Sequence, residues 1–486
     1  MLEQQLRSFF AKSDDVILKS SALGGDDAQN QVLLIYCEGM SNLGHMEQLV
    51  MPQLHALFAN QLEFKGSQLD VNTMLQLNEM MGIDEPGFLQ RLSVLVYRGE
   101  LALFFEQSQR LYTLDIASPP NRSPEESATE TAIMGARDGF IEDIRINIAL
   151  IRKRLLTNSL CCEKFDIGRR SHTTVALLYL DDVINKAVLA DVKSKLQRID
   201  VDGLVSSAQL EESLSERKFT FFPLLDYAGR PDYIVEALLK GRFVILVDGN
   251  PLALVAPANL LMILKSPEDL HFPFYYVAFE RVLRIAGLII ATLLPGFWIA
   301  LSAYNIEQLP FPLVATISSS RLGLPMSGPI DFILMIILFE LFREAGMRLP
   351  KAVGQTVTVV GGLIVGDAAI RAGVTSPTTL MVTSVSTIAM FTLVNQSLSG
   401  TITVLRIIIL LLSTLFGIFG FMLGLIGVVL YLSTLESFGT PYLAPVSPPT
   451  FKDMVAALFQ KPWKFMKQRP GMLHTEDNTS QGDDQT

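Results

Sequence analysis

Charged residues are distributed very unevenly along the chain, and this limits how it can fold. They are dense up to about Arg284 and sparse from there to Glu436. Three runs contain no charge at all, namely Ile285–Ile306, Ala372–Leu405 and Ile407–Leu435. A helix that crosses a bilayer needs about 20 mainly apolar residues, and helical structure satisfies the backbone groups that lipid cannot. The pattern therefore predicts a water-soluble half followed by a membrane half.

Two further segments of the membrane half are less apolar. Asp331–Gly346 is apolar only in its first half, and Ala352–Gly373 is rich in small residues and is interrupted by Asp367 and Arg371. Neither segment is suited to face lipid on all sides, because polar or irregular backbone at membrane depth must be sheltered by protein or water. The short, proline-flanked run Pro310–Pro325 is an alternative sixth element.

Lys and Arg residues indicate orientation, since they concentrate on the cytoplasmic side of a membrane. If all the flanking groups are cytoplasmic, the chain enters and leaves on that side and crosses an even number of times. We therefore expect a membrane domain over residues 282–436 with four to five spans, of which four are full crossings, and a re-entrant segment at 352–373. The flanking groups are Arg281 and Arg284; Arg343, Arg348 and Lys351; and Lys452, Lys461, Lys464, Lys467 and Arg469.

A stripe of charge lies inside this apolar half, in the sequence FELFREAGMRLP. Spacings of three and four residues place its members on one broad helix face. One interpretation is the cytoplasmic end of a helix, where acids and bases pair along the stripe and long side chains reach water. The other is a charged collar at the mouth of an aqueous path or against a partner subunit. The residues of the stripe are Glu340, Arg343, Glu344 and Arg348.

Small and hydroxyl-bearing residues form a second polar feature. Gln355, Thr358 and Gly362 share a helical face, and Asp367 follows them. Such residues let helices approach closely, and the same chemistry can line a water-filled pore. An isolated Asp367 would require water, a cation or Arg371 as a partner. The pattern predicts either tight helix packing or a pore lining.

A glycine motif lies in the last apolar run. In GIFGFMLGLIG, Gly420 and Gly424 form a GxxxG face. This spacing is typical of close helix packing and, in some proteins, of oligomerisation. We therefore expect these two glycines to lie at a helix–helix contact.

The half before the spans alternates strand-like and helix-like patterns. VLLIYCEGM and VLVYRGELALFFEQ are apolar runs bounded by turn residues, which predicts strands. VALLYL and RFVILVDGNPLALVAP are similar, and DGNP predicts a hairpin turn. ASPPNRSPEESATE has the composition of a linker. We expect two α/β subdomains, at residues 1–118 and 131–281, joined by a linker at 119–130.

Composition and motifs exclude several functional classes. The formal net charge of −10 argues against a nucleic-acid partner. The three cysteines, Cys37, Cys161 and Cys162, form neither a disulfide framework nor a CxxC pair. The five histidines lack metal-ligand spacing, and GxxxxGK, GxSxG and HExxH motifs are absent. We therefore expect no enzymatic activity, no cofactor and no metal site.

Both ends of the chain are expected in the cytoplasm. The first 25 residues have no long apolar core, so we predict no cleaved signal. Residues 437–486 form the C-terminal tail. Within it, FKDMVAALFQKPWKFMKQ is basic and amphipathic, and Phe451, Val455, Leu458 and Trp463 are expected at the lipid surface. The last stretch, HTEDNTSQGDDQT, is acidic and is expected to be disordered.

Several long motifs together resemble one known family. They occur in a fixed order: LIYCEGM, PPNRSPEES, TETAIMGARDGFIEDIRINIALIRKRL, GRPDYIVEALLKGRFVILVDGNPLALVAP, ELFREAGMRLPKAVGQTVTVVGGLIVG and SFGTPYLAP. Over nearly its whole length the chain resembles the A subunits of the GerA-type spore germinant receptors of endospore-forming bacteria. Asp367, within GLIVGDAA, departs from this resemblance, which implies an uncharged or amide residue there.

The resemblance implies a function that composition alone does not. It implies an A subunit that works with a transporter-like B subunit and a lipoprotein C subunit in the spore inner membrane. It also implies a homo-oligomeric ring, five-fold, around a cation-conducting pore that a nutrient opens. In that arrangement Gln355, Thr358, Gly362 and Asp367 would line the pore, and the charged stripe would couple the gate to the soluble half.

Three readings of function remain open at this point. The first is the ligand-gated channel subunit. The second is a secondary transporter, for which broken, small-residue helices near mid-membrane are also typical, although no inverted repeat is visible. The third is a membrane scaffold, or a paralogue that acts without its own nutrient-sensing partner.

Overall fold

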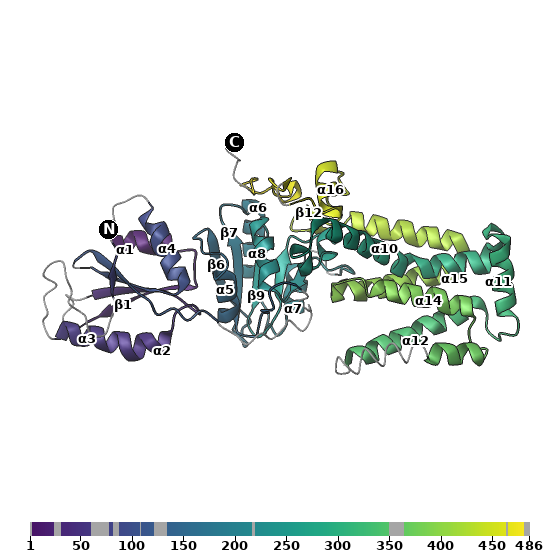
Figure 1. Cartoon of the computed structure of the whole chain (residues 1–486), viewed down its shortest axis with the longest axis horizontal. Coiled ribbons are helices and arrows are strands. Elements are labelled where there is room, and N and C mark those ends of the chain that lie inside the picture. The colour runs from purple at the N-terminus through teal and green to yellow at the C-terminus, as the bar shows by residue number, and fades with distance from the viewer. Residues whose placement is uncertain are drawn as a thin grey trace.

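The computed structural model comprises two α/β units and a bundle of helices, which follow one another along the long axis of the molecule (Figure 1). The N-terminus lies in the first unit, and the chain ends beside the second. This arrangement confirms an α/β region of two subdomains followed by a helical part. The structure describes residues 2–23, 31–59, 77–80, 87–106, 108–120, 134–215, 219–348, 364–462 and 465–480.

The first unit is built on an antiparallel sheet with the strand order β1-β2-β4-β5-β3. Side chains on β2 alternate between the two faces. Leu33 and Ile35 pack with α1 and α4, and Leu34 packs with the helices of the other face. The elements are α1 (Leu2–Phe9), β1 (Val16–Ala22), β2 (Gln31–Cys37), α2 (Leu43–His45), a π-helical turn (Met46–Val50), α3 (Met51–Ala59), β3 (Asn78–Glu79), α4 (Phe88–Arg98), β4 (Leu101–Phe105) and β5 (Arg110–Leu114).

The second unit repeats this strand order with its own elements, β6-β7-β9-β10-β8. DGNP forms the turn between β9 and β10, which confirms the predicted hairpin. The elements are α5 (Ile144–Arg152), β6 (Leu160–Ile167), β7 (Thr173–Leu180), α6 (Lys186–Arg198), α7 (Ser207–Leu214), β8 (Asp226–Ala228), α8 (Pro231–Leu239), β9 (Phe243–Val247), β10 (Ala253–Ala256), α9 (Leu260–Ile263) and a 3-10 turn (Pro267–Leu270).

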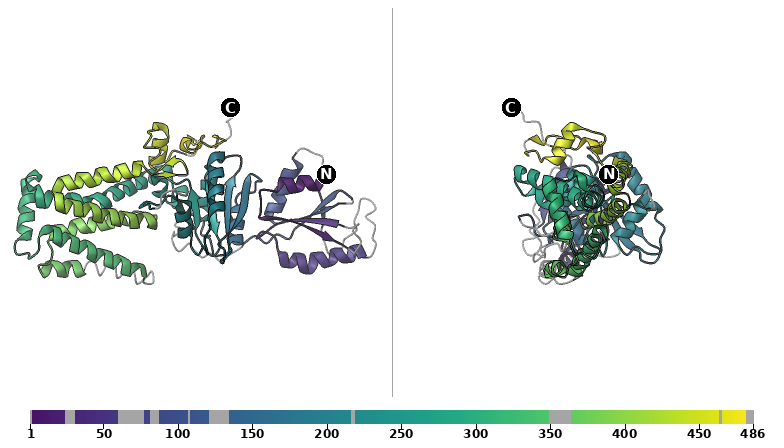
Figure 2. Two further views of the ribbon diagram at one scale, coloured as in Figure 1. Left: turned by 180° about the vertical axis from the view of Figure 1, so that it is seen from behind. Right: turned by 90° about the vertical axis from the view of Figure 1, so that its right-hand side faces the viewer.

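The helical part begins with α10 at Phe274. Its elements are α10 (Phe274–Ile299), a π-helical turn (Ala300–Tyr304), a 3-10 turn (Ile306–Gln308), α11 (Phe311–Arg321), α12 (Gly328–Arg348), α14 (Pro377–Met390) and α15 (Gln396–Ser433), and residues 364–371 are also helical. The run 310–325 therefore forms the short helix α11, which lies at the end of the bundle farthest from the α/β units (Figure 2).

Two of the uncharged runs are divided, which we did not expect. Residues 391–395 separate α14 from α15, so the run 372–405 is not one helix. Inside α15, Gly417 has φ +60° and ψ −137°, and the chain reverses there. Gly424 consequently faces Ile409, because a Cβ added to that glycine would lie 3.1 Å from Ile409 Cγ1. The run 407–435 is thus two antiparallel legs, and the yellow-green leg returns toward β12 (Figure 1).

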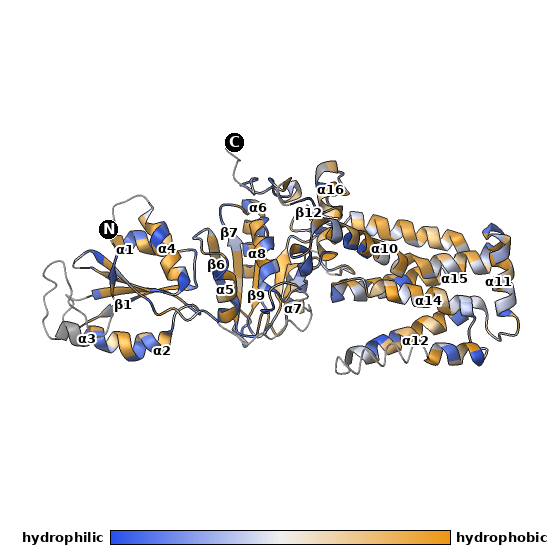
Figure 3. Cartoon of the chain, in the orientation of Figure 1, coloured by the Kyte–Doolittle hydropathy of each residue, from blue (hydrophilic) through white to orange (hydrophobic). Residues whose placement is uncertain are grey.

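Most residues of the bundle helices are hydrophobic, with hydrophilic positions on α11 and α12 (Figure 3). Within the described residues, two segments are long and apolar enough to cross a membrane, Phe274–Tyr304 and Gln396–Ser433. Many of their large side chains face outward, among them Phe279, Leu415 and Phe419. These features are typical of helices in lipid. The number of crossings and the domain boundaries stay predictions.

The C-terminal tail folds back onto the second unit. Tyr442 is fully buried in the core that this unit shares with the bundle. Arg469 pairs with Asp477 at 2.6 Å, and its Nε donates to the Leu239 carbonyl oxygen on α8 at 2.8 Å. The expected disorder of the last residues stays a prediction. The elements are β11 (Glu436–Ser437), β12 (Thr440–Pro441), α16 (Phe451–Leu458) and a 3-10 turn (Gly471–Leu473). Phe451 on α16 is exposed, and Trp463 lies outside the described residues.

Candidate functional site

The second α/β unit and the bundle share one hydrophobic core. Leu224 and Ile263 of the unit belong to the same buried cluster as Met390, Leu398 and Ile402 of the bundle. Burying this surface stabilises the contact by about 25 cal/mol per Å² of apolar area. The two parts are therefore joined by packing as well as by the chain itself.

Both legs of the α15 hairpin also bond to the segment before β8. Thr401, near the start of the first leg, donates a hydrogen bond to the Phe221 carbonyl oxygen. Tyr431, near the end of the second leg, accepts one from the Phe221 backbone N–H at 3.0 Å. Movement of the Phe221 backbone would therefore strain or break hydrogen bonds to both legs.

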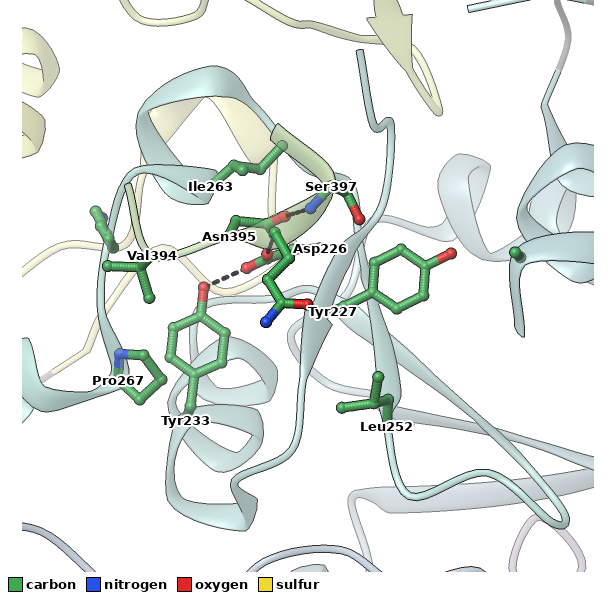
Figure 4. Close-up of a pocket in the computed structure, with 12 residues that line it drawn as sticks. Asp226, Tyr227, Tyr233, Leu252, Ile263, Pro267, Val394, Asn395 and Ser397 are labelled. Carbon is green, nitrogen blue, oxygen red and sulfur yellow. Dashed lines mark hydrogen bonds between the residues drawn. The ribbon is translucent and has the colours of Figure 1, made fainter. Parts of the chain in front are cut away.

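A carboxylate lies at the centre of this junction (Figure 4). Asp226, on β8, is 5% exposed and accepts a hydrogen bond from the Tyr233 hydroxyl at 2.6 Å. Its other oxygen accepts one from the Asn395 side-chain amide at 2.9 Å. Asn395 precedes α15, and its own oxygen caps that helix by accepting from the Ser397 backbone N–H at 2.9 Å. One side chain therefore connects β8 to the start of α15.

Burial dominates the ionisation of Asp226. It raises the pKa of this carboxyl to about 6, although the hydrogen bonds from Tyr233 and Asn395 and the charge of Arg242 act in the opposite direction. The sequence analysis did not single out Asp226, because loop and edge-strand acids are usually solvated. One of its hydrogen-bond partners, Asn395, lies 169 positions away, and a single sequence does not reveal such a contact.

The predicted charged stripe is paired across two helices. Glu340 on α12 bonds to Arg343 at 2.7 Å, as the spacing allows, and also to Arg406 on α15. Arg343 in turn lies 3.5 Å from the hydroxyls of Ser399 and Thr403. Glu344 is exposed on the same helix, and the side chain of Arg348 lies outside what the structure describes.

Arg406 is a member of this cluster that the sequence analysis missed. It is 1% exposed, and two of its nitrogens, Nε and Nη1, have no hydrogen-bond partner within the described structure. A signal was present, because Arg406 alone separates two uncharged runs that together cover residues 372–435. A single charge at such a position is a functional candidate by default.

The predicted pore-lining residues are only partly described. Gln355, Thr358 and Gly362 lie outside the described residues, so their role stays a prediction. Asp367 is exposed and pairs with Arg371 at 2.8 Å, which is one of the partners we considered. Within the described part of the chain, no group of three or more His, Cys, Asp or Glu side chains is placed to hold a metal ion.

The predicted packing glycines lie between the two legs of α15. A Cβ on Gly420 would lie 2.0 Å from the Leu412 carbonyl oxygen, which leaves no room for one. Gly424 faces Ile409, as described above. Whether either glycine also serves oligomerisation stays a prediction.

Comparison with known proteins identifies the family. A family model described as "Bacillus/Clostridium GerA spore germination protein" matches residues 4–472. The chain belongs to the GerA family. This membership confirms the resemblance that the sequence motifs carry.

Relatives of this GerA-family chain align over most of its length. Spore germination protein XA of Bacillus anthracis is 42% identical over 485 residues, which are 99% of this chain and 97% of that protein. Uncharacterized membrane protein YfkQ of Bacillus subtilis (strain 168) is 34% identical, covering 90% and 84% respectively. Spore germination protein KA of the same organism is 30% identical, covering 97% and 86%.

Among the solved structures that match, one is similar to the α/β region of this chain. It is the crystal structure of the N-terminal domain of the A subunit of the Bacillus megaterium spore germinant receptor GerK3. It is 24% identical, with a TM-score of 0.39, and covers 53% of this chain and 93% of that chain.

Proposed function

We propose that this chain is the A subunit of a nutrient-responsive spore germination receptor. The observation that carries the proposal is the family match across residues 4–472, together with relatives named as spore germination proteins. The two long apolar segments support a place in a membrane, which we propose to be the spore inner membrane with both termini in the cytoplasm. A transporter-like B subunit and a lipoprotein C subunit would be its partners.

Copies of the chain would assemble into a ring, which we take as five-fold, around a cation-conducting pore. Gln355, Thr358, Gly362 and Asp367 would line that pore. The pairs Glu340–Arg343 and Glu340–Arg406 support a polar element between α12 and α15. Converting a mostly closed ring to a mostly open one requires roughly 5.5 kcal/mol of differential affinity, and several subunits can share it.

The pore assignment is tested at Gly362. Replacing Gly362 with Leu should block nutrient-triggered release of monovalent cations from spores without preventing assembly, because a bulky side chain would close the path. Gly427→Leu is the matched control, since a Cβ there meets no atom within 4 Å. Release would be measured by ion-selective electrodes, and assembly by crosslinking in the membrane.

Three results, from spores and from the protein reconstituted in vesicles, separate the candidate functions. Normal release in Gly362→Leu spores would refute the pore lining. Slow, saturable uptake by the reconstituted protein would favour a transporter. A complete absence of flux, with a phenotype that depends only on the α/β units, would favour a scaffold.

The junction would transmit the nutrient signal between the α/β units and the hairpin. Asn395→Ala removes the bond to Asp226 and also the cap of α15, at a cost of roughly 1 kcal/mol for each. We expect a several-fold change in the rate of ion release with normal insertion in the membrane. Ser376→Ala, which removes the cap of α14 and leaves β8 untouched, is the control. Equal behaviour of the two variants would contradict the coupling role.

A further inference from the structure

A cavity of about 280 Å³ lies at the junction between the second α/β unit and α15 (Figure 4). Asp226 and Tyr233 line one side, and Gln396 and Ser397, from the first turn of α15, line another. Lys265 also lines it. The volume is just below the range for small-molecule sites, which is about 300–1,000 Å³. It suits a ligand of only a few heavy atoms.

Three other cations lie near Lys265 but outside the lining of the cavity, and two of them pair with a carboxylate. Lys240 pairs with Glu236. Arg281 pairs with Asp269 at 3.0 Å. Arg242 is buried near Asp226, with 4% of its surface exposed, and its charge favours the ionised form of that carboxyl. The carboxylates reduce the positive charge of Lys240 and Arg281, although both still act on Lys265.

Lys265 is the exception. Among the described residues, no carboxylate lies within 4 Å of its ammonium group, and its side chain donates no hydrogen bond. Burial lowers the pKa of Lys265 well below its usual value, and the charges of Lys240, Arg281 and Arg242 lower it further, against the opposing charge of Glu236. An ammonium group in this position gains most from an added negative charge.

The start of α15 presents donors to the same cavity. Gln396 and Ser397 are exposed, and within the described structure their side chains form no hydrogen bond, so an amide and a hydroxyl are available. The N-terminal end of a long helix also carries partial positive charge. The lysine and the helix end lie on different elements, so their contributions are independent.

We propose that this cavity binds a small anion, a carboxylate or phosphate group, with Lys265 as its counter-charge and Gln396 and Ser397 as hydrogen-bond donors. The bound group would connect the second α/β unit to α15, in addition to the Asp226–Asn395 bond. It could be free in the cytoplasm or belong to a lipid headgroup, because α10 begins at Phe274, only nine residues after Lys265. The binding does not depend on the proposed channel.

Isothermal titration of the full chain in detergent tests the site. The probes are acetate, inorganic phosphate and a short-chain phosphatidylglycerol, each in two buffers with different heats of protonation. We expect saturable binding of at least one probe, with uptake of a proton by Lys265 that makes the apparent affinity fall as the pH rises. Lys265→Met should weaken binding at least tenfold and abolish the proton uptake.

Controls make each outcome decisive. Lys186→Met removes a surface lysine that pairs with Asp181 at 2.9 Å and does not line the cavity, so this variant should bind as the wild type does. If Lys265→Met does not fold, a Gln396→Ala, Ser397→Ala double variant takes its place, and at least threefold weaker binding is expected. Binding of the soluble anions identifies a free ligand, and binding of phosphatidylglycerol alone identifies a headgroup. No saturable binding, or unchanged binding in these variants, would overturn the proposal.

Discussion

Two buried arginines, one in the α/β region and one in the helix bundle, are held in opposite ways. Arg152, at the end of α5, is fully buried, and its Nε and Nη2 each donate to Asp15 at 2.8 Å. Its Nη1 donates to the Leu160 carbonyl oxygen at 2.9 Å. Arg406 in the bundle bonds to Glu340 through Nη2, and its Nε and Nη1 have no partner in the described structure.

The difference indicates which part of the molecule is fixed and which can change. A fully bonded buried ion pair specifies one arrangement, because every alternative leaves a charge without a partner. Arg152 and Asp15 belong to different α/β units, so this pair fixes the two units against each other. A buried arginine with unused donors is not held as strongly, since another arrangement could satisfy it better. The α12–α15 contact is therefore the better candidate for movement.

The largest effect is expected from Asp15→Ala. It leaves the Arg152 guanidinium buried without a counter-charge, which costs about 3–5 kcal/mol. Hydrogen exchange measured by mass spectrometry should show loss of protection in β1 and β6, the strands beside the pair. A decrease of less than about 1 kcal/mol in the free energy of unfolding would contradict the proposed difference between the two arginines.

The double variant Asp15→Leu, Arg152→Met is the control for this prediction. It replaces the pair with apolar side chains of similar size, which is often neutral for stability. Recovery of most of the protection would attribute the loss in Asp15→Ala to the unpaired charge. A double variant that is as unstable as Asp15→Ala would attribute it to lost packing instead.

Local patterns predicted much of the fold. The alternation of apolar runs and turns predicted two α/β subdomains, and DGNP predicted the β9–β10 hairpin. The shared strand order of the two units was not foreseen, because pairing between distant strands leaves no mark in a local pattern. The reversal at Gly417 was also missed, since a glycine within an apolar run is no stop signal by itself.

The candidate site was harder to predict because it depends on long-range contacts. The stripe on α12 was visible from its spacing, but its partner Arg406 is 66 positions from Glu340. The Asp226–Asn395 bond joins residues 169 positions apart. Arg and Asp are common residues, and it is the burial of Arg406 and Asp226 in the folded chain that makes them candidate functional residues.

Asp226 offers a second test of how the two regions differ, because it is a buried carboxyl group where the α/β region meets the helix bundle. Its pKa of about 6 in the folded chain is above the usual value, so the folded state binds the proton more tightly than the unfolded state. The higher pKa in the folded state adds to the free energy of unfolding. This contribution is complete below about pH 4 and is lost as the pH rises through 6. Between pH 5 and pH 7 we expect a loss of roughly 1 kcal/mol.

The measurement is the pH dependence of thermal unfolding, compared between the wild type and Asp226→Asn. The variant cannot titrate at this position, so its stability should change less from pH 5 to pH 7. Comparing the two proteins cancels the contribution of every group that titrates equally in both. Parallel pH profiles for the two proteins would show that Asp226 does not titrate there.

The smallest effect on stability is expected from Arg406→Met, although it also removes a buried arginine. Glu340 still pairs with Arg343 at 2.7 Å, so its carboxylate keeps a counter-charge. The substitution also removes Nε and Nη1 of Arg406, the two buried donors without partners in the described structure. The stability of the bundle should change by less than about 1 kcal/mol, in either direction. If the α12–α15 contact moves during gating, the same variant should shift the nutrient concentration that triggers ion release. Destabilisation as large as that of Asp15→Ala would mean that both arginines are structural, and that the bundle is as fixed as the α/β units.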